Sequence, residues 1–290
     1  MNLKIFITLL LVIFLLSSCC NIEPDSKTPS PPSPVFLKMH FIDVGQGDSI
    51  LVETPGGKNM LIDAGDNSEG ERVVSYIEKE GIKRLDVIVA THPDSDHIGG
   101  MDNVVESFDV GKIYMPDKTK TTKTFKDVLV SIRDKGLKIT KARAGVNIDL
   151  DPSINVEILS PNSAEYEETN NYSIVIKLVY DNTSFLLPGD AEGFSEKEMI
   201  KKGYDLKSDV LKLGHHGSHS STTPDFLEKV SPKYAIICAG KGNKFGHPHK
   251  ETLKKLKKAG IQLYRTDKNG TIIAISDGKR IEFNLEREDN

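Results

Sequence analysis

The stretch that decides the fold of this chain is Thr91-His92-Pro93-Asp94-Ser95-Asp96-His97. Its last six residues contain four side chains of types that bind metal ions. Alternate residues of an extended segment point to the same side, so His92, Asp94 and Asp96 can converge. His97 then turns towards a neighbouring point, and this spacing can serve two adjacent metal ions. The alternative is a solvated acidic loop with two incidental histidines.

The residues on both sides of this stretch fit a loop at the end of a buried strand. Residues 85–90 form a continuous apolar run, which is typical of a buried strand. Gly99 and Gly100 follow the stretch and permit a tight turn near the metals. We therefore expect a strand to deliver the potential ligands into this loop.

Strands in runs, with helices between them, are expected along the rest of the chain. The further strands are predicted at residues 49–54, 59–63, 112–115, 155–159, 173–180, 183–188, 209–213, 234–239, 262–265, 271–276 and 280–284. The helices are predicted at residues 71–80, 124–135, 191–202, 225–230 and 250–259. This succession favours a mixed α+β architecture, although periodicity alone does not name the fold.

The N-terminal residues have the composition of an export signal rather than of a folded domain. A short basic region at Lys4 precedes an apolar run at residues 5–16. This run is shorter than the roughly 20 apolar residues that a membrane-spanning helix needs. The run ends in Leu-Ser-Ser-Cys at residues 16–19, which resembles the lipobox of bacterial lipoproteins. The alternatives are an uncleaved anchor and an ordinary secretory signal.

We accordingly expect three segments in the chain. Residues 1–18 are predicted to be a lipoprotein signal peptide, residues 19–34 a Pro- and Ser-rich tether, and residues 35–290 the folded domain. Lipidation at Cys19 would anchor the protein to the membrane of a bacterial cell envelope, with the domain outside the cytoplasm. Cys238 is predicted to be a buried thiol, and no disulfide framework is available to the domain.

The metal-binding stretch resembles the signature of metallo-β-lactamase-fold hydrolases, Thr-His-x-Asp-x-Asp-His-x-Gly-Gly in this chain. The common form of that signature has His at the position of Asp94. The Asp variant is similar to the C-terminal hydrolase domain of the competence protein ComEC. Other segments that fit the same subfamily lie at residues 41–49, 61–65, 187–192, 211–218, 246–249, 264–267 and 269–272. The resemblance covers roughly residues 37–285 and implies an αββα sandwich.

The resemblance also implies a set of ligands for two divalent metal ions. The first metal would have His92, Asp94 and Asp190, and the second would have Asp96, His97, Asp190 and His215. Asp190 would be the bridging carboxylate, although it also fits the N-cap of the helix at 191–202. Of the adjacent pair His215 and His216, one should complete the second site, and we favour His215. The predicted catalytic residues are Asp96, Asp190 and His216.

One departure from the family pattern bears on the identity of the metal. Most members supply another His between the loop motif and the bridging Asp, whereas no His lies between His97 and His215 here. Asn170 or Asn171 is the candidate for that place. The site is therefore rich in oxygen ligands, which favours Mn²⁺ or Mg²⁺, while its imidazoles keep Zn²⁺ possible.

The expected chemistry is hydrolysis by a hydroxide that bridges the two metals. Two cations about 3.5–4 Å apart lower the pKa of a bridging water, which suits phosphodiesters, esters or amides. Net charge is only −4 and does not indicate a nucleic-acid binder. A lysine cluster, however, offers a positive field for a polyanion, or else a solvated helix face. Its members are Lys241, Lys244, Lys250, Lys254, Lys255, Lys257 and Lys258.

These observations lead to one preferred function and two alternatives. The preferred function is a phosphodiesterase or nuclease that acts on DNA or nucleotides, with no protein partner indicated. The alternatives are an esterase, lactonase or β-lactamase-like hydrolase, and a non-catalytic domain that binds DNA or another polymer. The predicted substrate-binding residues are Lys212, Ser218, His247 and His249. Asp43, Asp48 and Asp63 are expected to support the site or to have structural roles.

Overall fold

The computed structural model describes residues 35–288. The predicted signal peptide, the predicted tether and Cys19 lie outside the described residues. Within the described part, none of the helices is both long enough and apolar enough to cross a membrane.

The first sheet has eight strands in the order β14-β13-β1-β2-β3-β4-β5-β6. Its neighbours pair in antiparallel fashion from β14 to β3 and in parallel from β3 to β6. The strands are β1 Leu37–Phe41, β2 Ile50–Glu53, β3 Asn59–Ile62, β4 Arg84–Val89, β5 Asp109–Pro116, β6 Ile139–Ala142, β13 Ile272–Ser276 and β14 Ile281–Leu285.

The second sheet has six strands in the order β12-β11-β10-β9-β8-β7. Strands β7, β8 and β9 are antiparallel neighbours, and the pairing from β9 to β12 is parallel. The strands are β7 Asn155–Ser160, β8 Val175–Tyr180, β9 Thr183–Leu187, β10 Val210–Lys212, β11 Tyr234–Ile237 and β12 Gln262–Arg265.

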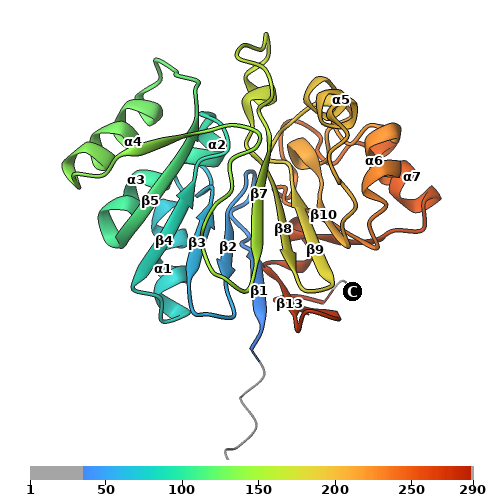
Figure 1. Cartoon of the computed structure of the whole chain (residues 1–290), viewed down its shortest axis with the longest axis horizontal. Coiled ribbons are helices and arrows are strands. Elements are labelled where there is room, and N and C mark those ends of the chain that lie inside the picture. The colour runs from blue at the N-terminus through green and yellow to red at the C-terminus, as the bar shows by residue number, and fades with distance from the viewer. Residues whose placement is uncertain (1–34, 289–290) are drawn as a thin grey trace, which may run out of the picture. The chain divides into compact units, whose positions relative to one another are not determined.

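The helices cover the outer faces of the two sheets. Figure 1 shows α1, α3 and α4 outside the first sheet, and α5, α6 and α7 outside the second. The helices are α1 Gly70–Lys79, α2 Ser95–Ile98, α3 Met101–Ser107, α4 Lys123–Asp134, α5 Gly193–Lys202, α6 Pro224–Val230, α7 Lys250–Lys258 and α8 Thr266–Asn269. Two short 3₁₀ turns are η1 Thr169–Tyr172 and η2 Gly214–Gly217. The predicted αββα sandwich is confirmed.

Alternating side chains on the strands fill the spaces between the four layers. On β2, Ile50 and Val52 are buried in the core between the two sheets. Leu51, which lies between them, belongs to the core under the helices that cover the first sheet. A third apolar core lies between the second sheet and its helices. Burial of each such side chain stabilises the fold by roughly 1.5–3 kcal/mol, which ties the strand register to the layered arrangement.

The two sheets bring the ends of several strands to a common place. Residues 91–97 follow β4, and Asp63 follows β3, which pairs with β4 in parallel. In the second sheet, Asp190 follows β9 and η2 follows its parallel neighbour β10. Because parallel strands end on the same edge of a sheet, the polar loops of each sheet gather there. The candidate site forms where these loops meet.

Candidate metal centre

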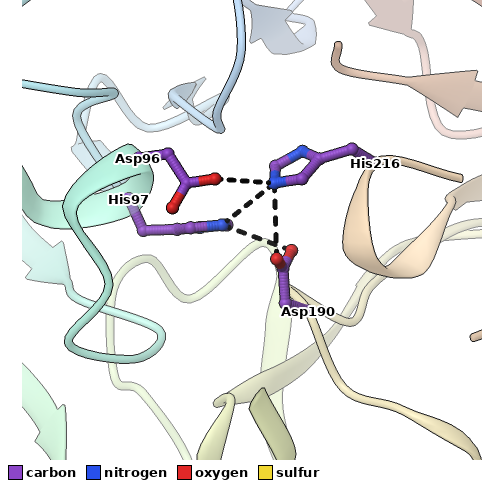
Figure 2. A group of neighbouring side chains, drawn as sticks. All are labelled: Asp96, His97, Asp190 and His216. Carbon is purple, nitrogen blue, oxygen red and sulfur yellow. Dashed lines mark hydrogen bonds and ion pairs between the residues drawn. The ribbon is translucent and has the colours of Figure 1, made fainter. Parts of the chain in front are cut away.

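Four side chains from both halves of the sandwich converge on one point. They are Asp96, His97, Asp190 and His216, and one ligand atom from each lies within 4.8 Å of all the others. Figure 2 shows the four side chains pointing towards one another, two from α2 and one from each of the loops after β9 and β10. The sequence places these residues up to 120 positions apart, so the fold is what creates the cluster.

The Nε2 atom of His216 is at the centre of the contacts. It lies 3.2 Å from Asp96 Oδ2, 3.3 Å from Asp190 Oδ2 and 3.3 Å from the Nε2 atom of His97. The Nε2 atom of His97 is in turn 3.2 Å from Asp190 Oδ1. Two imidazole nitrogens and two carboxylates that face one another form a donor set that suits a divalent cation.

A buried polar atom without a hydrogen-bond partner supports the same interpretation. The Nε2 atom of His92 is buried and has no hydrogen-bond partner within the described residues. Leaving such an atom unsatisfied costs stability, so it calls for an explanation such as an ion. The residues present therefore fit a metal centre.

Asp63 fixes the orientation of His97. Its Oδ2 atom lies 2.7 Å from His97 Nδ1, and its carboxylate accepts hydrogen bonds from the Thr91 backbone N–H and hydroxyl at 2.8 and 2.6 Å. Burial raises the pKa of the Asp63 carboxyl. Although burial alone would lower the pKa of His97, the carboxylates of Asp190 and Asp63 raise it well above its usual range. A carboxylate behind a histidine leaves the Nε2 atom directed at the centre.

His216 and His215 have different surroundings although they are adjacent. The Nδ1 atom of His216 lies 2.9 Å from the Cys238 carbonyl oxygen and 3.4 Å from Asp48 Oδ1, so its Nε2 atom faces the cluster. His215 is a quarter exposed, its Nδ1 atom lies 3.1 Å from Glu192 Oε1, and its Nε2 atom is 3.8 Å from Asp190 Oδ2. The structure thus brings His216 into the four-residue group and leaves His215, the ligand expected from sequence, beside it.

His92 lies next to the cluster. Its ring is buried, its centroid is 4.2 Å from that of His97, and its Nδ1 atom lies 3.3 Å from the Ser173 hydroxyl. Burial and the neighbouring His97 lower the pKa of His92 to about 4, so this imidazole is neutral at physiological pH. A neutral, buried imidazole with a free Nε2 atom is suited to bind a metal ion.

Asp94 is more peripheral than the other predicted ligands. It occupies the N-cap position of α2, and its Oδ1 atom accepts a hydrogen bond of 2.5 Å from Lys120 Nζ. Its side chain is 30% exposed, whereas those of His92 and His97 are buried. The carboxylate would have to give up its bond to Lys120 in order to ligate a metal.

Lys212 lies within the protein interior. The side chain is fully buried, forms a close ion pair with Asp48, and donates a hydrogen bond of 3.0 Å to the Gly189 carbonyl oxygen. Its Nζ atom is also 3.7 Å from Asp190 Oδ1. This placement argues against the expected contact with substrate. It indicates that Lys212 stabilises the negative charges of Asp48 and Asp190.

Asn170 and Asn171, the candidates for the missing histidine position, contact residues beside the cluster. The amide of Asn170 lies 3.3 Å from His215 Nδ1. The Oδ1 atom of Asn171 accepts hydrogen bonds from the backbone N–H groups of Glu192 and Ser195, each at 3.2 Å. Asn171 therefore secures the start of α5, and neither residue belongs to the four-residue group.

The remaining predicted substrate-binding residues lie on the loops beyond the His pair. Ser218 is buried and its hydroxyl lies 2.9 Å from that of Ser220. The ring of His247 has its centroid 5.2 Å from that of His215, and burial lowers its pKa to about 4. His249 accepts a hydrogen bond of 3.0 Å from the backbone N–H of His219. His247 is thus the member of this set with a ring next to the His pair.

Two supporting residues could not be ranked from the sequence. Asp48 contacts Lys212 and His216, and Glu192 contacts His215, so both help to position the charged groups. Asp48 stands in a Gly-rich segment, where an aspartate equally suits a turn. The packing of residues 43–48 against α2 is what distinguishes the two roles. This packing is close, because a Cβ on Gly47 would lie 2.2 Å from the Asp96 carbonyl oxygen.

Comparison with known proteins agrees with the fold. The model of the metallo-beta-lactamase superfamily matches residues 42–241. Among solved structures, the chain is similar to a metallo hydrolase of Ignicoccus hospitalis, with a TM-score of 0.54 and 17% identity over 82% of this chain and 98% of that one. It is also similar to the metallo-beta-lactamase fold protein YhfI of Bacillus subtilis, with a TM-score of 0.54 and 13% identity over 83% of this chain and 99% of that one. At these identities the likeness concerns the fold alone.

Curated relatives have higher sequence identity but are much longer. ComE operon protein 3 of Bacillus subtilis is 34% identical over 81% of this chain and 32% of the relative. Competence protein ComA of Neisseria gonorrhoeae is 31% identical over 79% of this chain and 31% of the relative. Recombination protein 2 of Haemophilus influenzae is 29% identical over 85% of this chain and 29% of the relative. The chain therefore corresponds to about a third of the length of these proteins.

Proposed function

Because this chain belongs to the metallo-beta-lactamase superfamily, we propose that it is a metal-dependent phosphodiesterase that acts on nucleic acid or nucleotides. The chain is a metallo-hydrolase of that superfamily, and the cluster of Asp96, His97, Asp190 and His216 is the observation that carries the proposal. Beyond membership of the superfamily, we propose the number of metal ions, the residues that bind each ion and the class of substrate.

The two oxygens of Asp190 face the two imidazoles of the cluster, which supports a role for Asp190 as a metal ligand. Oδ1 lies 3.2 Å from His97 Nε2, and Oδ2 lies 3.3 Å from His216 Nε2. A carboxylate has two oxygens, so Asp190 could be shared between the ion at this cluster and a second one. We assign Asp96, His97 and His216 to one ion, and His92 and Asp94 to the other.

The metals would supply an acidified water and would offset the negative charge of the transition state. The residues of the chain hold this site in position. Asp63 directs the His97 ring, and the Asp48 carboxylate with the Cys238 carbonyl directs the His216 ring. Two buried carboxylates that support two imidazoles keep the donor atoms in place before any substrate arrives.

The donor set favours a hard metal ion over Zn²⁺. The assigned ligands contain three carboxylates, Asp94, Asp96 and Asp190, beside three imidazoles. Carboxylate oxygens suit Mn²⁺ or Mg²⁺ better than a site of histidines alone would. We therefore expect more activity with Mn²⁺ than with Zn²⁺.

The surroundings of the cluster support an anionic substrate. The loop that carries His247 also carries Lys241 and Lys244, whose side chains are exposed to solvent. Exposed cations next to a metal centre attract a phosphate-containing substrate. The names of two relatives, which refer to competence and to recombination, are consistent with nucleic acid as that substrate.

A substrate screen tests the proposal. The full chain is purified, treated with chelator and reconstituted with Mn²⁺ or Zn²⁺, and is then assayed on oligonucleotides, bis(p-nitrophenyl) phosphate and p-nitrophenyl esters. We expect phosphodiester hydrolysis that is highest with Mn²⁺ and absent in excess chelator. If the protein hydrolyses esters but no phosphodiester with either metal ion, the proposed function is wrong and the alternative, a hydrolase of small-molecule esters, replaces it.

A further inference from the structure

The loop between β11 and α7 places an exposed aromatic ring beside the metal cluster. Phe245 is 51% exposed, and its ring stacks on His247 with a centroid distance of 5.7 Å and an interplanar angle of 23°. The His247 ring is in contact with the His pair, with centroid distances of 5.2 Å to His215 and 6.2 Å to His216. A continuous row of rings therefore runs from the candidate metal ligand to the solvent.

The side chain of Asn243 holds this loop in one shape. Its amide nitrogen donates to the carbonyl oxygens of Gly240 and His247 at 2.9 and 2.6 Å. Its amide oxygen accepts from the backbone N–H groups of Phe245 and His247 at 3.2 and 3.0 Å. Four hydrogen bonds from one side chain fix the backbone on both sides of Phe245, so the exposed ring is presented in a defined orientation.

Both ends of the loop are attached to loops of the metal site. The backbone N–H of Gly240 donates to Gln46 Oε1 at 3.2 Å, and a Cβ on Gly240 would lie 2.8 Å from the Gln46 backbone nitrogen. At the other end, the His249 N–H donates to the carbonyl oxygen of Gly217 at 3.1 Å. The position of Phe245 is thus tied to the position of His216.

The charge around Phe245 is positive. The Nζ atom of Lys244 lies over the ring, 5.1 Å from its centroid, and Lys241 and Lys250 are exposed nearby along the chain. An aromatic ring beside ammonium groups is the combination that binds a nucleobase together with its phosphate. An apolar protein surface would be a poor partner for a ring surrounded by solvated lysines, because those charges would lose their water.

A second exposed aromatic residue near the site has the opposite charge around it. Phe194, at the start of α5, is 58% exposed and lines a hollow of about 510 Å³. The same hollow is lined by Glu165, Glu167, Glu168 and Glu192. Carboxylates repel phosphates, so this side of the site does not suit a polyanion. The contrast selects Phe245 rather than Phe194 as the residue that receives nucleic acid.

We propose that Phe245 is a stacking platform for one unpaired base of a single-stranded nucleic acid whose phosphodiester lies at the metal cluster. This inference rests on the proposed function and deepens it. Base stacking requires a base outside a duplex, so the platform selects single strands or strand ends. The ammonium of Lys244, which lies over the ring in the structure, would move aside and contact a phosphate next to the stacked base.

Binding without turnover tests the platform separately from catalysis. Fluorescence anisotropy is measured in excess chelator with a labelled oligothymidylate and with an abasic oligomer of the same length. We expect Phe245→Ala to weaken oligothymidylate binding about tenfold, within the range for loss of one stacked base. Binding of the abasic oligomer should stay unchanged. Phe245→Trp should keep the affinity, and Phe194→Ala is the matched control that should leave it unaltered.

Steady-state kinetics with metal provide the second readout. Phe245→Ala should raise KM for oligothymidylate by a similar factor and leave the hydrolysis of bis(p-nitrophenyl) phosphate unchanged. An equal loss on both substrates would overturn the platform and identify Phe245 as structural. Equal effects of Phe245→Ala and Phe194→Ala on oligothymidylate, or equal losses for the two oligomers, would also overturn it. If wild type hydrolyses no phosphodiester, the proposed function fails while anisotropy still decides whether the platform exists.

Discussion

At the scale of single residues, the adjacent histidines show why a motif does not identify its own ligands. Both His215 and His216 have a left-handed backbone, with φ of 48° and 54°. This conformation is uncommon outside glycine and turns the two side chains to different neighbours. The sequence predicts that one of the pair contacts the metals, but the choice depends on these two dihedral angles.

We predict that His216→Ala removes about one equivalent of bound metal, because its Nε2 atom is at the centre of the cluster contacts. His215→Ala should retain the metal content, since the Nδ1 atom of that ring contacts Glu192 and the residue lies outside the four-residue group. Elemental analysis of the two purified variants after reconstitution and desalting measures this difference. Loss of metal in His215→Ala with full retention in His216→Ala would reverse the assignment.

A second residue-scale prediction concerns the buried pair Lys212 and Asp48. Lys212→Met leaves the Asp48 carboxylate buried without its cation, and removal of one partner of a buried pair costs about 3–5 kcal/mol. The double variant Asp48→Asn with Lys212→Met should regain most of that stability, because the Asp48 charge that Lys212 balances is then also absent. Urea unfolding of the metal-free proteins measures both effects.

An additive loss in the double variant would contradict the pairing.

The sequence alone could not rank Lys212 as a buried residue, because a lysine before a His pair equally suits phosphate binding. Its position on a three-residue strand buried throughout is what removes it from solvent.

At the scale of elements, the sequence predicts a strand or helix well where apolar side chains recur with a regular period and pack against a core. The strands predicted at residues 59–63 and 155–159 correspond to β3 and β7. The predicted elements do not include α2, α3 or β6. The helices α2 and α3 are interrupted by Gly99-Gly100, and β6 is exposed at three of its four positions, so neither region has a clear apolar period.

The lysine cluster divides between two elements, which gives an element-scale prediction. Lys241, Lys244 and Lys250 lie on the Phe245 loop or at the first position of α7. Lys258 lines a hollow with Leu227 and Ile261 at the other end of that helix. A helix advances about 1.5 Å per residue, so the two ends of α7 are more than about 10 Å apart.

Replacing Lys241, Lys244 and Lys250 by Gln should therefore weaken oligonucleotide binding and flatten its salt dependence, with a slope reduced by about 1 for each phosphate that is no longer neutralised. The matched control changes Lys254, Lys257 and Lys258 to Gln, which removes the same charge from α7. Anisotropy titrations at several salt concentrations measure both triples. Equal slopes for the two would show that net charge alone, and not the Phe245 loop, attracts the polyanion.

At the scale of the whole molecule, the fold is predictable only through the motif. The alternation of apolar residues indicates strands and helices, but it does not fix the order of strands in two sheets. The spacing of the potential metal ligands at residues 92–97 indicates this strand order indirectly, because it resembles the signature of one fold family. Contacts such as that between His97 and His216 depend on the packing of the two sheets, so no local pattern in the sequence predicts them.

We also propose that the domain is held at a membrane by lipid on Cys19, a residue outside the described part of the chain. The basic start, the apolar run and the Leu-Ser-Ser-Cys ending at residues 16–19 support this location. Cys19→Ala should release the protein from the membrane fraction or block its maturation. Cell fractionation with detection of the mature form measures this, and unchanged processing with membrane retention would argue against the anchor.

The central claim is that phosphodiester hydrolysis depends on metals held around Asp190. The most direct test is kcat/KM for an oligonucleotide with Mn²⁺, measured for wild type, Asp190→Asn and the control Asp117→Asn, whose side chain is 71% exposed in an ion pair with Lys141. Asp190→Asn should lower kcat/KM about a thousandfold, or about 4 kcal/mol of transition-state stabilisation. Asp117→Asn should match wild type. Wild-type activity in Asp190→Asn, or activity that survives excess chelator, would contradict the claim.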